Sequence, residues 1–147
     1  MDYGIIWPTV ALVALIYAVW VFMFVKRMHL LRTKPPKPDE LATGESALRY
    51  FQPVEMPANN LANLFEMPVM FFALVPLLLV TREAGPLQVF LAWLYVLTRI
   101  GHSYIHVTRG KVTTRFAVYL ASCVVLSAMW IGFAINIAAD QAASAAL

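Results

Sequence analysis

The strongest constraint on the fold is a set of four apolar stretches, each at least as long as the roughly 20 residues that a helix needs to cross a bilayer. They cover residues 5–25, 57–80, 86–107 and 116–139. A soluble domain carries about 25% charged residues, whereas 13% of these 147 residues are charged and 61% are hydrophobic. Short links, residues 81–85 and 108–114, join the last three stretches, so neighbouring helices must run antiparallel. We therefore predict an all-α integral membrane protein, in which residues 1–147 form one domain, a four-helix antiparallel bundle.

The one long connection, residues 26–56, carries most of the positive charge. Its proline-rich segment, residues 34–38, is expected to be extended, and residues 45–52 are expected to form a short interfacial helix. Cations cluster in this connection and around the link between the last two spans: Lys26, Arg27, Arg32, Lys34, Lys37 and Arg49 in the first, and Arg109, Lys111 and Arg115 in the second. By the positive-inside rule, both connections are cytoplasmic and both termini face the other side. We expect the long connection to meet anionic membrane lipids, and no nucleic-acid surface is recognisable.

Polar residues inside the spans are the candidates for function, because a charged side chain at mid-bilayer costs at least about 2.5–3.5 kcal/mol on insertion scales. Two helical rows stand out, each with the spacing of one helix face: Asn59, Asn63 and Glu66 in the second span, and Arg99, His102 and His106 in the third. Sequential antiparallel helices can bring such rows together. We therefore expect both rows to contribute to one site.

Two simple interpretations of these rows are open. Glu66 could pair with Arg99 only to neutralise a buried acid, since interhelical polar pairs are common in membrane proteins. Alternatively, His102 and His106, at i and i+4, could bind a metal ion together with Glu66. Arg99 and Arg109 place repulsive charge on the same face as the two imidazoles, which disfavours the metal.

A third interpretation comes from a family resemblance. The segment from Arg99 through His102 and His106 to the basic turn resembles the third-helix signature of the MAPEG superfamily, the membrane-associated proteins of eicosanoid and glutathione metabolism. His106 stands where the glutathione transferase branch has tyrosine. In the second span, Asn63-Leu-Phe-Glu66 is similar to the family's Asn-x-x-Glu motif. The pattern is most similar to the less characterised bacterial branch, which places the protein in a bacterial inner membrane.

The resemblance implies a homotrimer that binds glutathione between subunits near the cytoplasmic face. Asn63 and Glu66 would contact the tripeptide, with Glu66 reading its amino group. Arg99 and His102 would line the site, together with the residue in the tyrosine position, His106. Arg115 aligns with the arginine proposed to activate the thiol.

Two hypotheses about function follow. In the first, the protein is a glutathione-dependent membrane transferase or peroxidase that acts on lipophilic small molecules with an electrophilic centre, and its polar faces converge on a cleft. In the second, it is a non-catalytic relative that binds lipid or a partner protein, and Glu66 merely pairs with Arg99. Asn59 stands where family enzymes commonly have an arginine, which favours the second hypothesis. The presence of His102 and Arg115 favours the first.

Overall fold

The computed structural model describes residues 3–108 and 111–146, and within them every regular element is a helix. The elements in chain order are α1 (Ile6–Thr33), α2 (Gly44–Phe51), the 3-10 helix η1 (Gln52–Val54), α3 (Met56–Leu64), α4 (Met67–Val80), α5 (Pro86–Val107) and α6 (Val112–Ala145). The prediction of an all-α protein is confirmed.

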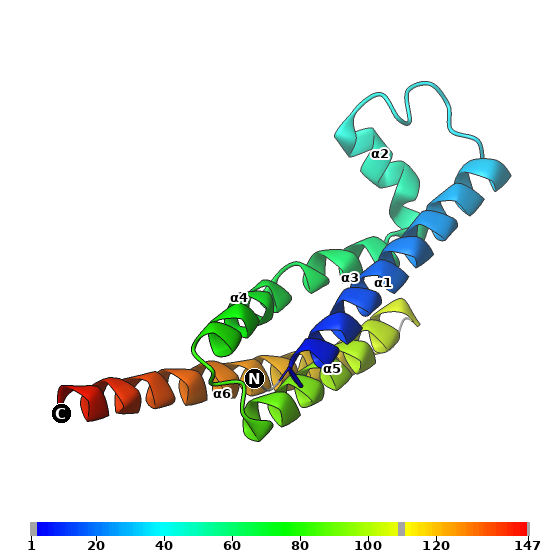
Figure 1. The fold of residues 1–147 in the computed structure, drawn as a ribbon. Helices are drawn as coiled ribbons and strands as arrows, with labels where there is room; N and C mark the ends of the chain where they lie inside the picture. Colours follow the sequence, from blue (N-terminus) through cyan, green and yellow to red (C-terminus); the bar gives the residue numbers. More distant parts are fainter. Residues whose placement is uncertain (1–2, 109–110, 147) are drawn as a thin grey trace.

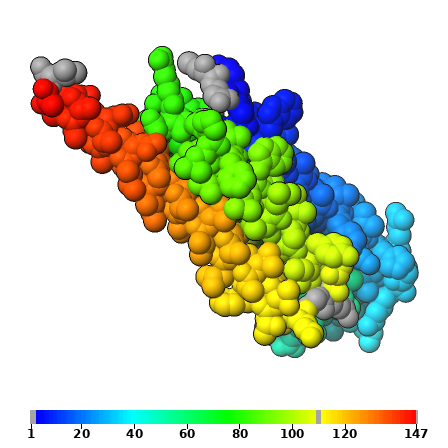
Figure 2. All heavy atoms as spheres, turned by 90° about the horizontal axis from the view of Figure 1, so that it is seen from below, coloured from blue at the N-terminus to red at the C-terminus, as the bar shows by residue number. Residues whose placement is uncertain are grey.

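The long helices form an antiparallel bundle in which α3 and α4 together make the second member (Figure 1). The two ends of the chain and the α4–α5 turn lie at one end of the bundle, and the α1–α2 connection and the α5–α6 turn lie at the other. Helix α5 packs most extensively against α6 and also contacts α1 and α3. Figure 2 shows α5 between α1 and α6 on one face of the molecule.

Within the described residues, three helical segments are long and apolar enough to cross a membrane: α1, α3 together with α4, and α6. Helix α5 has 22 residues, which is a sufficient length, but its polar side chains exclude it from this set. Apolar side chains such as Trp7, Tyr17 and Trp20 point outward and are exposed. Such a surface is stable in lipid but not in water. The chain is therefore an integral membrane protein.

Helices α1 and α6 are longer than the apolar stretches that predicted them. Residues 26–33, which we expected in the long connection, continue α1 as helix to Thr33. The helix ends where Lys34 precedes Pro35, a position that disfavours helical backbone. Helix α6 has 34 residues, a length of about 50 Å against a hydrocarbon core of about 30 Å. Its last turns project beyond the neighbouring helices (Figure 2).

The second span is broken in the middle, and the expectation that Glu66 continues the row of Asn59 and Asn63 is wrong. Helix α3 ends at Leu64, and α4 begins at Met67 after Glu66 adopts φ −90° and ψ −100°. Pro68 has no N–H to donate to the carbonyl four residues earlier, so a continuous helix would lose a hydrogen bond here in any case. The break turns Glu66 out of the row, and its side chain is exposed.

The α4–α5 turn closes the end of α4 with a backbone motif. The amide of Glu83 donates to the carbonyl of Leu78, and the amide of Arg82 donates to that of Leu79. This pattern requires a left-handed residue after the helix, and Arg82 takes that conformation with φ 65°. Asn136 of α6 donates to the Glu83 carboxylate at 2.6 Å and ties the turn to the last helix.

The long connection folds back on the end of α1 through α2. Thr43 and Ser46 form a capping box at the start of α2, which confirms a short helix in this region. The hydroxyl of Tyr50 donates to the carbonyl of Lys34. These contacts hold the connection at the same end of the bundle as the polar half of α5.

The interior of the bundle is divided in two. Apolar side chains such as Leu12, Phe71, Leu78 and Met129 form a core towards the chain ends. The buried polar side chains of α5 begin at Arg99 and lie in the other half. A candidate site is therefore confined to the end of the bundle that carries the α1–α2 connection.

Candidate functional site

The second half of α5 carries a row of buried polar side chains. Arg99, His102, Ser103 and His106 are each at most 3% exposed. They lie on the part of α5 that packs between α3 and the first turns of α6. Buried polar groups need hydrogen-bond partners, and here several partners are backbone carbonyls of the neighbouring helices.

Arg99 holds the end of α3. Because the second span is broken, the carbonyl of Asn63 lacks the amide that a continuous helix would supply, and Nη2 of Arg99 donates to it at 2.9 Å. A cation is also favourable at the negative end of a helix dipole. The same guanidinium lies 5.6 Å from the ring centre of Tyr119. Arg99 therefore positions Asn63 and Tyr119 from behind, and it is not in the wall of the cavity described below.

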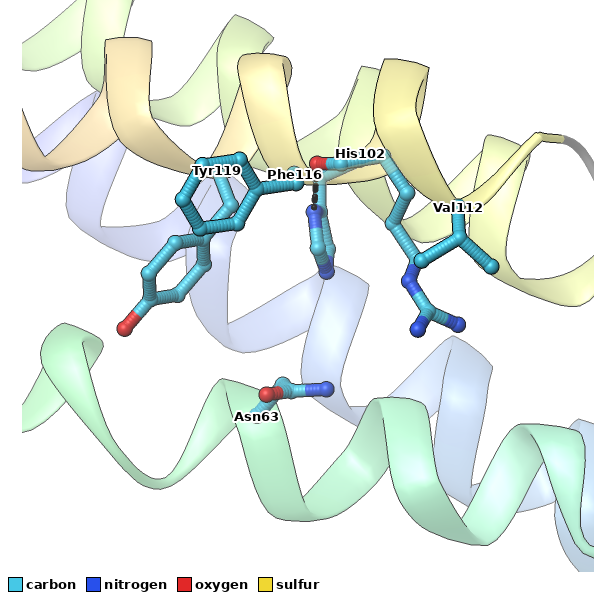
Figure 3. A pocket seen from close by; sticks show the side chains of 6 residues that line it. Asn63, His102, Val112, Phe116 and Tyr119 are labelled. Atoms are coloured by element: carbon cyan, nitrogen blue, oxygen red, sulfur yellow. Dashed lines mark hydrogen bonds between the residues drawn. The ribbon is translucent and has the colours of Figure 1, made fainter.

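His102 is held by α6. Its Nδ1 lies 3.2 Å from the backbone carbonyl of Arg115. A carbonyl only accepts hydrogen bonds, so this contact places the proton of the neutral imidazole on Nδ1 and leaves the lone pair on Nε2. Within the described residues Nε2 has no hydrogen-bond partner. Figure 3 shows the ring between this carbonyl and Asn63.

Asn63 links α3 to the end of α5. Its side-chain amide donates to the carbonyl of Asn59 at 3.0 Å and lies 3.4 Å from Nε2 of His106. The two imidazole rings, of His102 and His106, lie 5.7 Å apart. Asn63 therefore lies next to both histidines, with the two guanidinium groups nearby.

A cavity of about 230 Å³ opens between α3, α5 and the start of α6. It is lined by three predicted site residues and three others: Asn63, His102 and Arg115, with Val112, Phe116 and Tyr119. Figure 3 shows Asn63 on α3 across the cavity from Tyr119, Phe116 and Val112 of α6.

The cavity is electropositive. The Arg115 guanidinium lines it, and the first turn of α6 contains no acidic residue. The amides of a first helical turn lack intrahelical partners and carry the positive end of the helix dipole. The arrangement suits an anionic group, such as a thiolate or a carboxylate, next to the free nitrogen of His102.

Comparison with known proteins identifies the family. A sequence model of the MAPEG family matches residues 5–135, nearly the whole chain. The chain belongs to the MAPEG family. It is therefore a membrane protein of a family whose members act in glutathione and eicosanoid metabolism. No match was found among curated proteins or among solved structures.

In this MAPEG protein, the six predicted site residues take different positions. Asn63, His102 and Arg115 meet in the cavity wall, whereas Arg99 and His106 lie behind it. Glu66 is exposed. Arg109, which extends the polar row of α5 in the sequence, lies outside the described residues.

Glu66 does not serve to neutralise Arg99 in the described part of the chain. The salt bridge found there joins Glu45 and Arg49 on α2. The interpretation of Glu66 and Arg99 as a simple ion pair is thus not what the structure shows. A cleft lies near Arg99, as the transferase hypothesis expects.

Metal binding by the histidines finds no third ligand in the described residues. Within residues 3–108 and 111–146, no three His, Cys, Asp or Glu side chains are grouped closely enough to hold a metal ion. The two imidazoles contact a carbonyl and an amide instead.

Tyr119 is the cavity residue that the sequence reasoning missed. It lies one helical turn after Arg115, so both side chains share a face of α6, and its ring packs 5.8 Å from that of His102. The spacing of four was visible in the sequence. It carried no signal because a tyrosine in an apolar span is usually a packing residue.

Proposed function

We propose that this MAPEG protein is a glutathione-dependent membrane transferase or peroxidase that acts on lipophilic electrophiles. The observation that supports the proposal best is the cavity that combines the Arg115 guanidinium with His102 and Asn63. These residues come from three helices, and their buried polar groups cost free energy unless they are used. Such an arrangement is typical of a binding site rather than of a structural interface.

The residues present fit part of a glutathione molecule. Glutathione has two carboxylates, an amino group and a thiol. Arg115 and the start of α6 suit the thiolate or one carboxylate, because both supply positive charge to the cavity. Asn63 can both donate and accept hydrogen bonds. Glu66, which is exposed near this end of α3, is free to bind an amino group.

A single chain offers less space than the ligand needs. The cavity of about 230 Å³ is below the usual range of roughly 300–1,000 Å³ for small-molecule sites. In the proposed homotrimer, a neighbouring subunit supplies the missing wall and a cation for the second carboxylate.

The rim of the cavity is suited to a lipophilic co-substrate. Val112 and Phe116 line it and are 66% and 63% exposed. Both lie on α6, whose apolar surface faces lipid. A hydrophobic electrophile can therefore approach the Arg115 end of the cavity laterally from the bilayer.

The charge distribution orients the site. With the basic α1–α2 connection in the cytoplasm, the cavity opens near the cytoplasmic face, where glutathione is available, and both termini lie on the other side. The assignment to a bacterial inner membrane stays a prediction.

The test is a calorimetric titration of glutathione into the detergent-purified protein. Arg115→Ala should weaken binding by about tenfold or more, since a hydrogen bond to a charged group contributes about 1.5–3 kcal/mol. Glu66→Gln should weaken it less, because Glu66 is exposed. Arg49→Ala on the exposed face of α2 is the matched control and should bind as the native protein does.

The opposite result would be informative. If the native protein shows no saturable binding at millimolar glutathione, the transferase proposal is wrong. The alternative, a non-catalytic member that binds lipid or a partner protein, would then be favoured by Asn59, which stands in place of the family's arginine.

A further inference from the structure

His102 combines three properties that no other residue in the cavity has together. Its ring is buried and lines the cavity. The Arg115 carbonyl holds its Nδ1 at 3.2 Å. In the described structure its Nε2 has no hydrogen-bond partner. The neutral ring thus presents a basic nitrogen that is already oriented.

The other lining residues cannot take up a proton at neutral pH. The guanidinium of Arg115 stays protonated and only donates. The amide of Asn63 is not a base, and the phenol of Tyr119 already carries its proton. The remaining two lining residues are apolar. His102 is therefore the one base among the six residues that line the cavity.

His106 does not duplicate this role. Its Nε2 faces the Asn63 amide at 3.4 Å, and the residue does not line the cavity. The charged groups nearest His102 are cationic, Arg99 on its own helix and Arg115 on α6. None of the hydrogen bonds found in the described residues joins a carboxylate to the His102 imidazole. Such a ring can take a proton transiently and must pass it on.

We propose that His102 is the general base of this site, which accepts the thiol proton of the bound glutathione; this inference rests on the proposed function. The S–H bond breaks, the proton moves to Nε2, and the electron pair stays on sulfur next to the Arg115 guanidinium. The thiolate then forms a bond to one carbon of an activated double bond. The imidazolium returns the proton to the other carbon, so His102 ends the cycle neutral and no oxidant or reductant is needed.

The Arg115 residue serves the step twice. Its backbone carbonyl fixes the position of the His102 proton, and its side chain stabilises the sulfur anion. Division of the work in this way is chemically reasonable, because a guanidinium can stabilise a thiolate but cannot remove the proton that makes it.

The experiment compares the native protein with His102→Gln and with His29→Gln. Glutamine can still donate an amide hydrogen to the Arg115 carbonyl but is not a base. His29 is exposed on α1, so its variant is the matched control. Thiolate formation is followed by its ultraviolet absorbance, and proton release is counted by calorimetry in two buffers of different ionisation enthalpy.

The native protein and His29→Gln should form thiolate on binding glutathione without releasing the proton to the buffer, because His102 keeps it. His102→Gln should form little thiolate, and its rate of addition to an activated double bond should fall about a hundredfold or more. S-methylglutathione, which has no thiol proton, should bind His102→Gln within about threefold of the native affinity, which shows that the site is intact.

Two results would overturn the inference, and they are distinguishable from each other. If the native protein binds no glutathione, the proposed function fails and the inference fails with it. If the native protein binds glutathione but releases one proton for each thiolate formed, or if His102→Gln keeps its thiolate and its rate, the inference alone fails. If His102→Gln fails to bind S-methylglutathione, His102 shapes the site rather than acting as its base, which also contradicts the proposal.

Discussion

Replacing Arg99 with methionine should leave the free energy of unfolding nearly unchanged while weakening glutathione binding. Methionine keeps the length and most of the apolar stem of the side chain but removes the guanidinium. The native side chain is fully buried. Its Nε and Nη1 have no hydrogen-bond partner in the described structure. The variant therefore removes both a useful contact and an expensive buried charge.

The opposing terms are of similar size. Loss of the hydrogen bond from Nη2 to the Asn63 carbonyl, at 2.9 Å, costs about 1.5–3 kcal/mol for a charged donor. Loss of the contact with the Tyr119 ring, at 5.6 Å, costs about 0.5–1 kcal/mol. Removal of an arginine from within the membrane returns about 2.5–3.5 kcal/mol on insertion scales. The net change should lie within about 1.5 kcal/mol of zero.

The assay is unfolding by a denaturing detergent, followed by helix content and compared with Arg49→Met, which alters an exposed pair on α2. Glutathione affinity is measured on the same samples and should fall about tenfold, or about 1.4 kcal/mol, because Arg99 positions Asn63 and Tyr119. A loss of stability of about 3 kcal/mol or more, as for breaking a buried ion network, would refute this reasoning. It would show that Arg99 holds the bundle together.

Three further outcomes are expected. Tyr119→Phe keeps the ring over Arg99 but removes the hydroxyl, so glutathione should bind about two- to tenfold more weakly at unchanged stability, and unchanged affinity would contradict a role in binding. Arg82→Gly should stabilise the protein by about 0.5–1 kcal/mol in the same unfolding assay, since a non-glycine residue in the left-handed region is strained; a destabilised variant would contradict this. Burial, together with the Glu40 carboxylate, raises the pKa of Tyr50 above 10.0. Its bond to the Lys34 carbonyl should therefore stabilise the connection below pH 10.0 and be lost as the pH rises through the raised pKa. The difference in tyrosinate absorbance between the native protein and Tyr50→Phe should then titrate above pH 10.0, and a midpoint at or below that value would exclude the effect.

The number and type of the long helices could be predicted from apolar length alone. A bilayer has one thickness, so a charge-free run such as residues 5–25 has few alternatives to a spanning helix. Helix ends were less predictable. The span of α1 was predicted to end at Val25, but the helix continues to Thr33, because hydropathy reports where lipid ends and not where backbone hydrogen bonds end.

The site could be predicted only in part. The spacing of Arg99, His102 and His106 places them on one helix face, and all three are buried together. Glu66 was assigned to the same face as Asn63 by the same rule, and that assignment failed. Helical spacing holds only within an unbroken helix, and Pro68 follows Glu66 by two residues.

The sequence by itself determined the membrane environment, the antiparallel order of the helices and the concentration of polar groups on α5. These properties follow from the lengths of apolar runs and from short links, which act locally along the chain. Only the tertiary structure decided that Asn63, His102 and Arg115 share a cavity with Tyr119, and that a backbone carbonyl of α6 orients the His102 ring. Those contacts join helices that lie far apart in sequence, and they depend on how α3 ends and how α6 packs on α5, which no local pattern encodes.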